Sequence, residues 1–390
     1  MNLCIPYLSV YMLAIGLSDT NVGFIVTINT LSQMLFSFLS GPITDKMGRR
    51  KATAIFDILA WCIPCIIWWR AESFWFFFTA AILNGTNGVT TNSWHCLLVE
   101  DAEKKQITKI YSIIIACGQL CAVFAPITAI LISKLTLVPA IRILFINGCV
   151  LMLLKVIILY LASKETSIGI RRQQETAGKD IFHLTGGYGK IIKMILSSPG
   201  TVFSIIIAAL AWIVFTINSA FWQIIVSKKL MIPEAALPLF LVFRSILAIV
   251  FLFFIIPKLS KGILKMPLLL GFSAYFIGQC LLITVPIDGM LMYLLLCLSL
   301  VFDGFGLATL SMLSESLIAL HVNPDERARI MAIRYMIIML VTSPFGWIGG
   351  ILSDISRNLP FVLNMVVLVT GIVITLVYYR KSNDHSAEHT

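Results

Sequence analysis

Long apolar runs dominate this sequence, and they constrain its fold more than any other feature. A helix that crosses the hydrocarbon core of a bilayer needs about 20 mostly apolar residues. Strands of a membrane barrel are much shorter, and helices satisfy their own backbone hydrogen bonds in lipid. The sequence therefore predicts an all-α polytopic membrane protein with twelve transmembrane helices. The twelve runs are 1–17, 20–43, 52–70, 73–98, 108–133, 137–162, 199–227, 236–257, 264–285, 289–319, 328–352 and 358–379.

The low content of charged residues supports the same class. Charged residues make up 12% of the chain and hydrophobic residues 59%, whereas soluble domains have about 25% charged residues. The net charge of +10 comes from short Lys and Arg clusters between the apolar runs. Nucleic-acid binding needs a basic groove with interleaved aromatic residues, so we expect no nucleic-acid partner. The nine cysteines lie mostly inside apolar runs, and we expect no metal site.

The basic residues also predict the orientation of the chain. With the N-terminus inside the cell, the inner segments hold twenty Lys and Arg residues and the outer loops hold five. Cytoplasmic loops carry such an excess of basic residues, so we expect a monomer in the cell membrane with both termini cytoplasmic. The run 1–17 would rise only ~25 Å, less than the hydrocarbon core. We therefore expect a start upstream of Met1, the alternative being an unusually short first helix.

The longest polar interruption divides the runs six and six. Pro42 and Lys46 in the first half have the same spacing as Pro257 and Lys261 in the second. Repeated halves are a common construction in secondary transporters. The predicted organisation is a first six-helix bundle at 1–162, a cytoplasmic linker at 163–198, a second bundle at 199–379 and a cytoplasmic tail at 380–390.

The stretch GPITDKMGRRK, residues 41–51, concentrates charge between the second and third runs. It resembles the loop 2–3 signature of the major facilitator superfamily. The matching positions are Gly41, Asp45, Lys46, Gly48, Arg49, Arg50 and Lys51. This resemblance implies two six-helix bundles with one substrate cavity between them at mid-membrane. It also implies that contacts of this loop latch the bundles in the outward-open state and break as the inside opens.

The residue types of this stretch suit such a role. Gly48 allows a tight turn, and Arg49 can pair with a carboxylate through two parallel hydrogen bonds. Glu100 and Asp101, at the end of the fourth run, lie on the same side of the membrane and offer those carboxylates. The second half has Ser260 where its copy of the loop would carry the aspartate, so we expect only one intact latch. The alternative is a loop that sets topology without gating.

Two polar stripes are candidates for the lining of the cavity. Residues spaced three or four apart share one face of a helix, and a polar face is costly in lipid. The alternative is hydrogen bonding between helices without contact to a substrate. The stripe of the fourth run is Asn84, Asn87, Thr91 and His95, and that of the seventh run is Trp212, Thr216, Ser219 and Gln223.

Ionisable residues deep inside the runs are candidates for ion coupling. Along their helices, Asp303 and Arg334 both lie ~9 Å from the inner face, and Arg244 lies roughly 9 Å higher. We therefore predict that Arg334 is the partner of Asp303. Asp303 is the candidate for proton coupling or for binding a substrate charge, and a static ion pair is the alternative. His95 is a second candidate because its pKa suits proton transfer, although such a residue more often makes a structural hydrogen bond.

Together these features predict a secondary transporter that moves a small solute by alternating access. No Walker-type phosphate loop is present, so we expect no cofactor and an ion gradient, with protons preferred over sodium. The neutral stripes suit a neutral polar or amphipathic solute better than a polyanion. The alternatives are a drug-efflux antiporter, although the glycine-rich signature of that class is missing from the fifth run, a receptor that does not transport, and a polytopic membrane enzyme.

Overall fold

The computed structural model describes residues 4–102, 117, 124–178, 180, 188–255, 264–321 and 327–387. Within these residues the chain forms helices and no strands. The elements of the first half are η1 (Ile5–Tyr7), α1 (Leu8–Ala14), α2 (Asp19–Met47), α3 (Arg49–Asp57), η2 (Ile58–Cys62), α4 (Ile63–Trp69), α5 (Phe74–Gly85), α6 (Asn87–Val99), α8 (Ala125–Leu135) and α9 (Leu137–Ala162).

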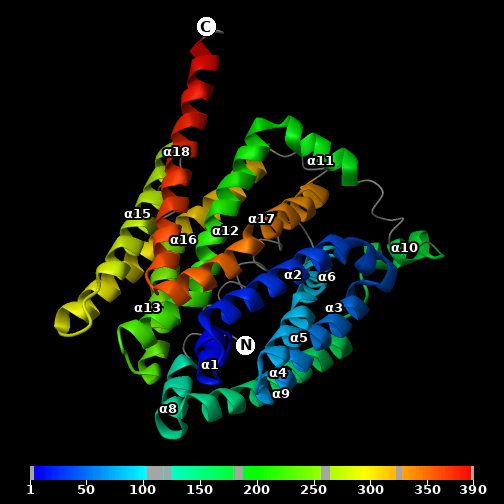
Figure 1. Ribbon diagram of the computed structural model, residues 1–390. Helices are drawn as coiled ribbons and strands as arrows, with labels where there is room; N and C mark the ends of the chain where they lie inside the picture. The colour runs from blue at the N-terminus through cyan, green and yellow to red at the C-terminus, as the bar shows by residue number, and fades with distance from the viewer. Residues whose placement is uncertain are drawn as a thin grey trace.

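Two short helices lie in the linker, and the second half follows. The linker helices are α10 (Ser167–Thr176) and α11 (Tyr188–Ser197). The elements of the second half are α12 (Pro199–Ile224), η5 (Ile225–Lys229), η6 (Glu234–Ala236), α13 (Leu237–Val250), η7 (Phe251–Ile255), α15 (Lys265–Thr284), α16 (Met290–His321), α17 (Arg327–Ile355) and α18 (Leu359–Ala387). Figure 1 shows the two halves side by side.

Each predicted span coincides with helical structure, the fifth only from residue 124 onward because most of its first part lies outside the described residues. Eight helices in the described part of the chain are long and apolar enough to cross a membrane. The third span is continued through a π-helical turn, η2, and the fourth is interrupted at Thr86 between α5 and α6. The helix α18 continues past its predicted end at 379 to Ala387.

The two halves meet most closely where α2 packs against α17 (Figure 1). A Cβ atom built on Gly23 would lie 2.3 Å from the Gly346 carbonyl oxygen and 2.8 Å from the Gly350 Cα. Small residues allow two membrane helices to approach this closely. The Thr27 hydroxyl donates a hydrogen bond to the Ser343 carbonyl oxygen at 2.7 Å. The halves are therefore joined through backbone contact as well as through side chains.

The molecule has two distinct ends. We call the end where α2 stops and α3 begins the linker end, because α10 and α11 follow there, and the other end the opposite end. At the opposite end the Asp354 carboxylate of α17 accepts hydrogen bonds from the Asp19 and Thr20 amides at 3.0 Å each. A carboxylate is favoured at a helix N-terminus, which carries partial positive charge. The hydrogen bonds and the ion pair that join described residues of one half to described residues of the other involve Asp19, Thr20 or Thr27, in the part of α2 nearest this end.

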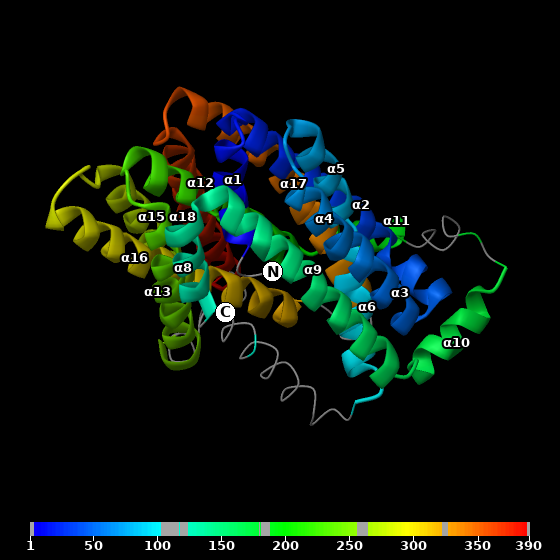
Figure 2. The same ribbon diagram turned by 90° about the horizontal axis from the view of Figure 1, so that it is seen from below.

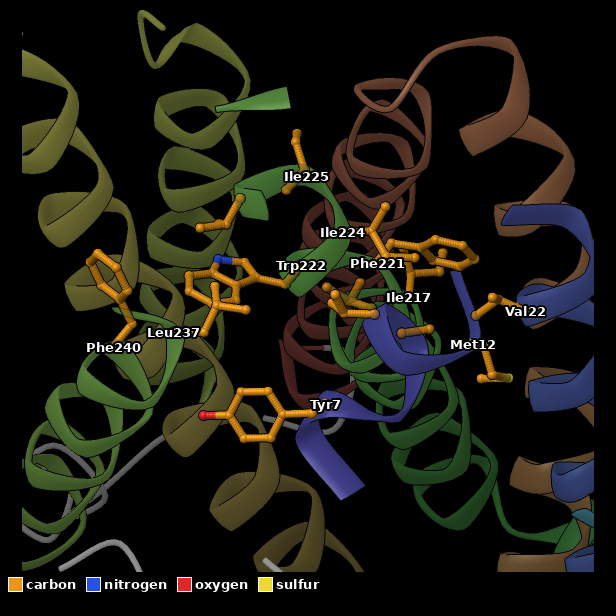
Figure 3. Close-up of a cluster of buried hydrophobic side chains, with 14 of the residues drawn as sticks. Tyr7, Met12, Val22, Ile217, Phe221, Trp222, Ile224, Ile225, Leu237 and Phe240 are labelled. Atoms are coloured by element: carbon orange, nitrogen blue, oxygen red, sulfur yellow. The ribbon is translucent and has the colours of Figure 1, made fainter. Parts of the chain in front are cut away.

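Apolar side chains fill the space between the halves at the opposite end. Met12 of α1, Val22 of α2, and Ile217 and Phe221 of α12 are buried together (Figure 3). The Phe221 ring lies 2.9 Å from the position that a Cβ on Gly349 of α17 would take. Four helices from both halves therefore close this end with a dry apolar contact.

Gly23→Ala is expected to lower the apparent melting temperature of the detergent-purified protein, because its methyl group would overlap the Gly346 carbonyl. Overpacking of this kind costs about 1–3 kcal/mol. The matched control is Gly304→Ala, where the nearest atom would be 3.6 Å away, on the Phe251 ring. Thermal unfolding of the two variants measures the difference, and equal melting temperatures would contradict the close packing of α2 on α17.

Candidate functional site

A cavity of about 450 Å³ lies between the two halves, beside residues 25–33 of α2 and 212–223 of α12, in the parts of these helices nearer the opposite end. Its walls come from α1, α2, α5 and the η2–α4 region of the first half and from α12, α13 and α17 of the second. The aromatic residues in its lining are Trp61, Trp68, Phe77, Trp212 and Phe215. The polar residues in its lining are Ser9, Asn29, Thr30, Gln33, Asn84, Thr216, Ser219, Gln223 and Arg244.

The helix α12 presents its predicted polar stripe to this cavity. Trp212, Thr216, Ser219 and Gln223 all belong to the lining. The helix is continuous from Pro199 to Ile224, so the spacing of four, three and four residues holds them on one face. The four residues of the predicted stripe therefore share the face of α12 that lines the cavity, and the opposite face of α12 packs within the second half.

The predicted stripe of the fourth span is divided. Asn84 lines the cavity, and its amide is already bonded: its nitrogen donates to the Ala60 carbonyl oxygen at 2.8 Å, and its oxygen accepts from Asn29 at 3.0 Å. Ala60 lies in the π-helical turn η2. A π-bulge disturbs the regular hydrogen bonding of a helix. Asn84 therefore supports the shape of the cavity wall at this bulge.

The other three residues of that stripe lie outside the cavity lining. Asn87 accepts a hydrogen bond from the Trp61 indole at 3.2 Å, Thr91 is exposed, and His95 packs beside the Trp94 ring. The stripe assumed one continuous helix, but the chain is interrupted at Thr86 between α5 and α6. The interruption breaks the helical register, so residues after it do not continue the face that carries Asn84.

Asp303 lies in a buried polar network within the second half. Its carboxylate accepts a hydrogen bond from the Gln279 amide at 2.9 Å. The Gln279 oxygen accepts from Asn364 at 3.0 Å, and the Asn218 amide donates to the Tyr275 hydroxyl at 2.8 Å. Asn364 also approaches the Asn218 oxygen, at 3.4 Å. The network therefore connects Asp303 of α16 to the side of α12 that faces away from the cavity.

The predicted pairing of Asp303 with Arg334 is not formed. Among the described residues the Asp303 carboxylate is bonded by Gln279, and the cation that acts on it electrostatically is Arg244. Arg334 is buried on α17, which packs against α2 and α12. Depth along a helix does not determine the direction of a side chain, and for this reason the comparison of depths indicated the wrong arginine.

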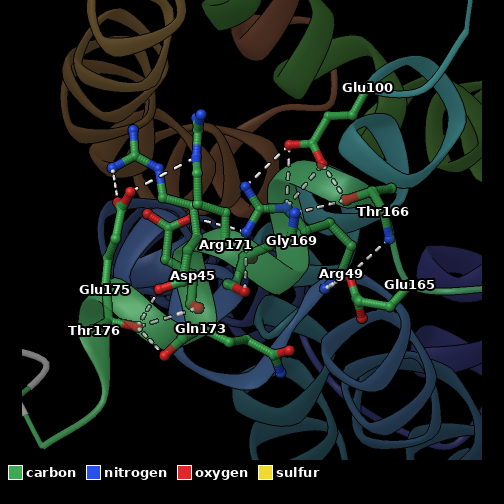
Figure 4. Close-up of polar contacts among 12 residues, drawn as sticks. Asp45, Arg49, Glu100, Glu165, Thr166, Gly169, Arg171, Gln173, Glu175 and Thr176 are labelled. Carbon is green, nitrogen blue, oxygen red and sulfur yellow. Dashed lines mark hydrogen bonds and ion pairs between the residues drawn. The ribbon is translucent and has the colours of Figure 1, made fainter.

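The charged loop forms a compact cluster at the linker end (Figure 4). The Arg49 guanidinium donates to the Glu100 carboxylate at 3.0 Å and to Asp45 at 2.8 Å. Gly48 has a φ of 84°, a conformation that glycine adopts without strain. Side-chain atoms of Glu165 and Gln173 would lie 2.6 Å from a Cβ on Gly48. This position therefore requires glycine for two reasons.

The linker helix α10 is docked on this cluster, beside α3 and α6 (Figure 2). The Glu165 carboxylate accepts from the Arg49 amide at 2.8 Å and from the Arg50 amide at 3.0 Å, at the N-terminus of α3. The Asp101 carboxylate accepts from the Ser167 amide at 3.1 Å. Glu165 was not among the residues predicted from the sequence. Its position two residues before α10 gave no sign that it would bind the start of α3, 115 or more residues away.

The remaining positions of the motif lie around this cluster. Arg50 stacks over the Tyr160 ring at 4.1 Å, Lys46 and Lys51 are exposed, and Gly41 is half-buried in α2. The contacts that Figure 4 draws lie within the first half, within α10, or between the first half and the linker residues from Glu165 to Thr176. The latch implied by the resemblance would join the two bundles, whereas in this structure the hydrogen bonds and ion pairs of Asp45, Arg49, Glu100 and Asp101 stay within the first half and its linker.

An ion pair with a buried carboxylate in the first half was also not predicted from the sequence. The Lys155 ammonium of α9 lies 2.6 Å from the Asp57 carboxylate of α3, and the side chains are 41% and 1% exposed. In the spans Arg49–Trp69 and Leu137–Ala162 both residues lie in the part nearer the linker end, where Lys side chains commonly extend to the membrane surface. The pair joins α3 to α9 and contributes no group to the cavity lining.

Similarity to known proteins agrees with this fold. The family model described as Major Facilitator Superfamily matches residues 1–286 and 201–390. An uncharacterized MFS-type transporter of Bacillus subtilis, YqjV, is 28% identical over 128 residues, which is 32% of this chain and 31% of that protein. The matched part thus spans about a third of that relative's length.

Solved structures of transporters share the fold. The nucleoside transporter NupG superimposes with a TM-score of 0.66 at 14% identity, covering 97% of this chain and 94% of its own. A mutant of the peptide transporter POT in complex with sulfate gives 0.70 at 16%, covering 98% and 91%. The xylose transporter XylE of E. coli, partially occluded and inward open, gives 0.66 at 15%, covering 97% and 93%. This chain belongs to the major facilitator superfamily and has its fold.

Proposed function

We propose that this chain is a secondary active transporter that moves a small solute across the cell membrane by alternating access. The cavity between the two halves carries this proposal. Its volume of about 450 Å³ falls in the range of sites for small molecules, about 300–1,000 Å³. Membership of a transporter family supports the same conclusion. The transporters of similar fold are named for nucleosides, peptides and xylose, so the fold alone does not identify the solute.

The state of the molecule follows from its two ends. The linker end carries the charged loop, and the excess of basic residues on that side supports a cytoplasmic location for it and for both termini. The opposite end would then face outward, and it is closed by the apolar contact around Phe221 and by the bonds of Asp354 to α2. In this arrangement the bundles 1–162 and 199–379 rock about the cavity within a single chain, and the conformation seen here is closed to the outside.

Gln223→Ala is expected to abolish the stabilisation that a bound solute gives. A ligand that binds only the folded protein raises its apparent stability by mass action. The measurement is the melting temperature of purified protein against sugars, amino acids, nucleosides, peptides and carboxylates. The matched control is Ser311→Ala, an exposed residue of α16 outside the cavity lining. A solute that stabilises the wild type and the Gln223→Ala protein equally would place the binding site elsewhere.

We further propose that transport is coupled to protons and that the Asp303 carboxylate takes up and releases the coupling proton. The carboxylate is buried, and its bonded neighbour is a neutral amide rather than a cation. A buried carboxylate that is not paired with a cation tends to take up a proton. Loss of that proton would change the charge balance with Arg244, which lines the cavity.

Asp303→Asn is therefore expected to uncouple solute accumulation from a pH gradient in proteoliposomes, because an amide cannot take up and release the proton. The matched control is Asp288→Asn, an exposed carboxylate outside the network. Uptake driven by an imposed pH gradient, compared with exchange at equal pH, separates coupling from binding. Gradient-driven accumulation at the wild-type level in Asp303→Asn would remove the coupling role.

The charged cluster is the proposed gate, with α10 as part of it. Glu165→Gln is expected to speed amide hydrogen exchange at Arg49, Arg50 and the start of α10, because a neutral amide replaces the carboxylate that accepts two amide hydrogen bonds. Hydrogen bonds to charged groups contribute about 1.5–3 kcal/mol, so exchange should be on the order of tenfold or more faster. The control is Glu175→Gln, whose ion pairs are exposed on α10. Unchanged exchange in Glu165→Gln would show that α10 is not held through this carboxylate.

A further inference from the structure

The cavity carries a positive charge, although nearly all of its lining residues are neutral. Among the described residues that line it, Arg244 of α13 is the one ionisable side chain, and the other polar groups are amides and hydroxyls. An arginine guanidinium stays protonated in proteins. The cavity therefore presents one fixed positive charge and no lining carboxylate to balance it.

Within the described part of the chain, this guanidinium makes no hydrogen bond and no ion pair. No hydrogen bond within 3.5 Å and no salt bridge within 4.0 Å joins Arg244 to any described residue. The first half treats its buried arginines differently, since Arg49 is bonded to Glu100 and Arg142 donates to the Ala71 carbonyl oxygen. An unpaired charge in the interior of a membrane protein is costly and usually serves a function.

The carboxylate that acts electrostatically on Arg244 lies outside the cavity lining. This carboxylate is that of Asp303, and it is bonded to Gln279, while the neutral phenol of Tyr275 is bonded to Asn218. Neither belongs to the cavity lining. The donors of the guanidinium are thus left for a group that enters the cavity, and a carboxylate matches their geometry with two parallel hydrogen bonds.

A second unpaired polar group lies in the same lining. Gln223 of α12 is 4% exposed, and its side-chain oxygen is buried without a hydrogen-bond partner. Leaving a buried acceptor unsatisfied costs about 1–3 kcal/mol. A solute with an N–H or O–H group would remove that cost. Besides these two groups, the indoles of Trp61 and Trp212 and the ring of Phe215 offer apolar and aromatic surface in the lining.

We propose that the cavity binds an organic monoanion whose carboxylate pairs with Arg244 and whose apolar or aromatic body carries a hydrogen-bond donor for Gln223. One cation in the lining matches one negative charge, so polyanions are poor ligands. This inference rests on the proposed function of the cavity and specifies its substrate class. It replaces the neutral solute that the two polar stripes had suggested.

The test compares acids with their own amides, which differ in charge and hardly in shape. The probes are indole-3-acetate against indole-3-acetamide and 4-hydroxyphenylacetate against 4-hydroxyphenylacetamide, measured by thermal stabilisation of the purified full chain. At least one acid should stabilise the wild type, and its amide should do so at least tenfold more weakly in apparent Kd. Arg244→Gln should lose this preference, and Arg244→Lys should keep part of it. Arg70→Gln, which removes an exposed arginine outside the lining, should leave it intact.

Three results would overturn the inference: equal binding of acid and amide, acid binding unchanged in Arg244→Gln, or no stabilisation of the wild type by either acid. If Arg244→Gln does not fold, the single variants Gln223→Leu and Arg244→Lys provide the test. Gln223→Leu should weaken the binding of both acids and keep the preference for the acid over its amide. Arg244→Lys should keep part of that preference. Uptake into proteoliposomes separates this inference from the proposed function. If an acid binds but is never transported, the proposed transport function is contradicted and the anion site is not. If a neutral solute is transported and no acid binds, the anion site is contradicted and the transport function is not.

Discussion

The close approach of α2 and α17 is the contact on which the arrangement of the two halves depends. Gly23 lets the backbones of the two helices meet at Gly346 and Gly350, and Thr27 bonds to the backbone of α17 one turn further on. In lipid there is no hydrophobic drive between helices, so such packing and hydrogen bonding supply the association. These contacts concentrate toward the opposite end, where the halves meet, and the cavity lies beside residues 25–33 of α2.

The two sides of the cavity are built in different ways. In the first half, polar side chains stabilise the cavity wall by bonding to one another and to the backbone. Asn84, for example, donates a hydrogen bond to the Ala60 carbonyl oxygen in the π-helical turn and accepts one from the Asn29 amide. In the second half the buried Gln223 oxygen lacks a hydrogen-bond partner, and Arg244 has neither a hydrogen bond nor an ion pair to any residue that the structure describes. The polar network around Asp303 lies outside this lining. The wall of α12 and α13 is therefore where a solute would be recognised, and a change in the charge of Asp303 would act on that same wall.

The sequence predicted the fold well because the bilayer leaves few choices. An apolar run of about 20 residues in lipid is a helix, and all twelve runs coincide with helical structure, the fifth in part. The stripe on α12 could be predicted because residues spaced three or four apart lie on one face as long as the helix is continuous. Of the stripe from Asn84 to His95, the structure places Asn84 in the cavity lining and the other three residues outside it, beyond an interruption at Thr86 that hydrophobicity does not reveal.

By itself the sequence determined the membrane class, the family motif and the polar face of α12, all of which depend on local composition and spacing. Only the tertiary structure decided that Glu165 binds the start of α3, that Gln279 rather than Arg334 bonds Asp303, and that Arg244 faces the cavity. The physical reason is that a charge in a helix can turn toward any neighbour. Which neighbour it meets depends on packing between helices distant in the chain.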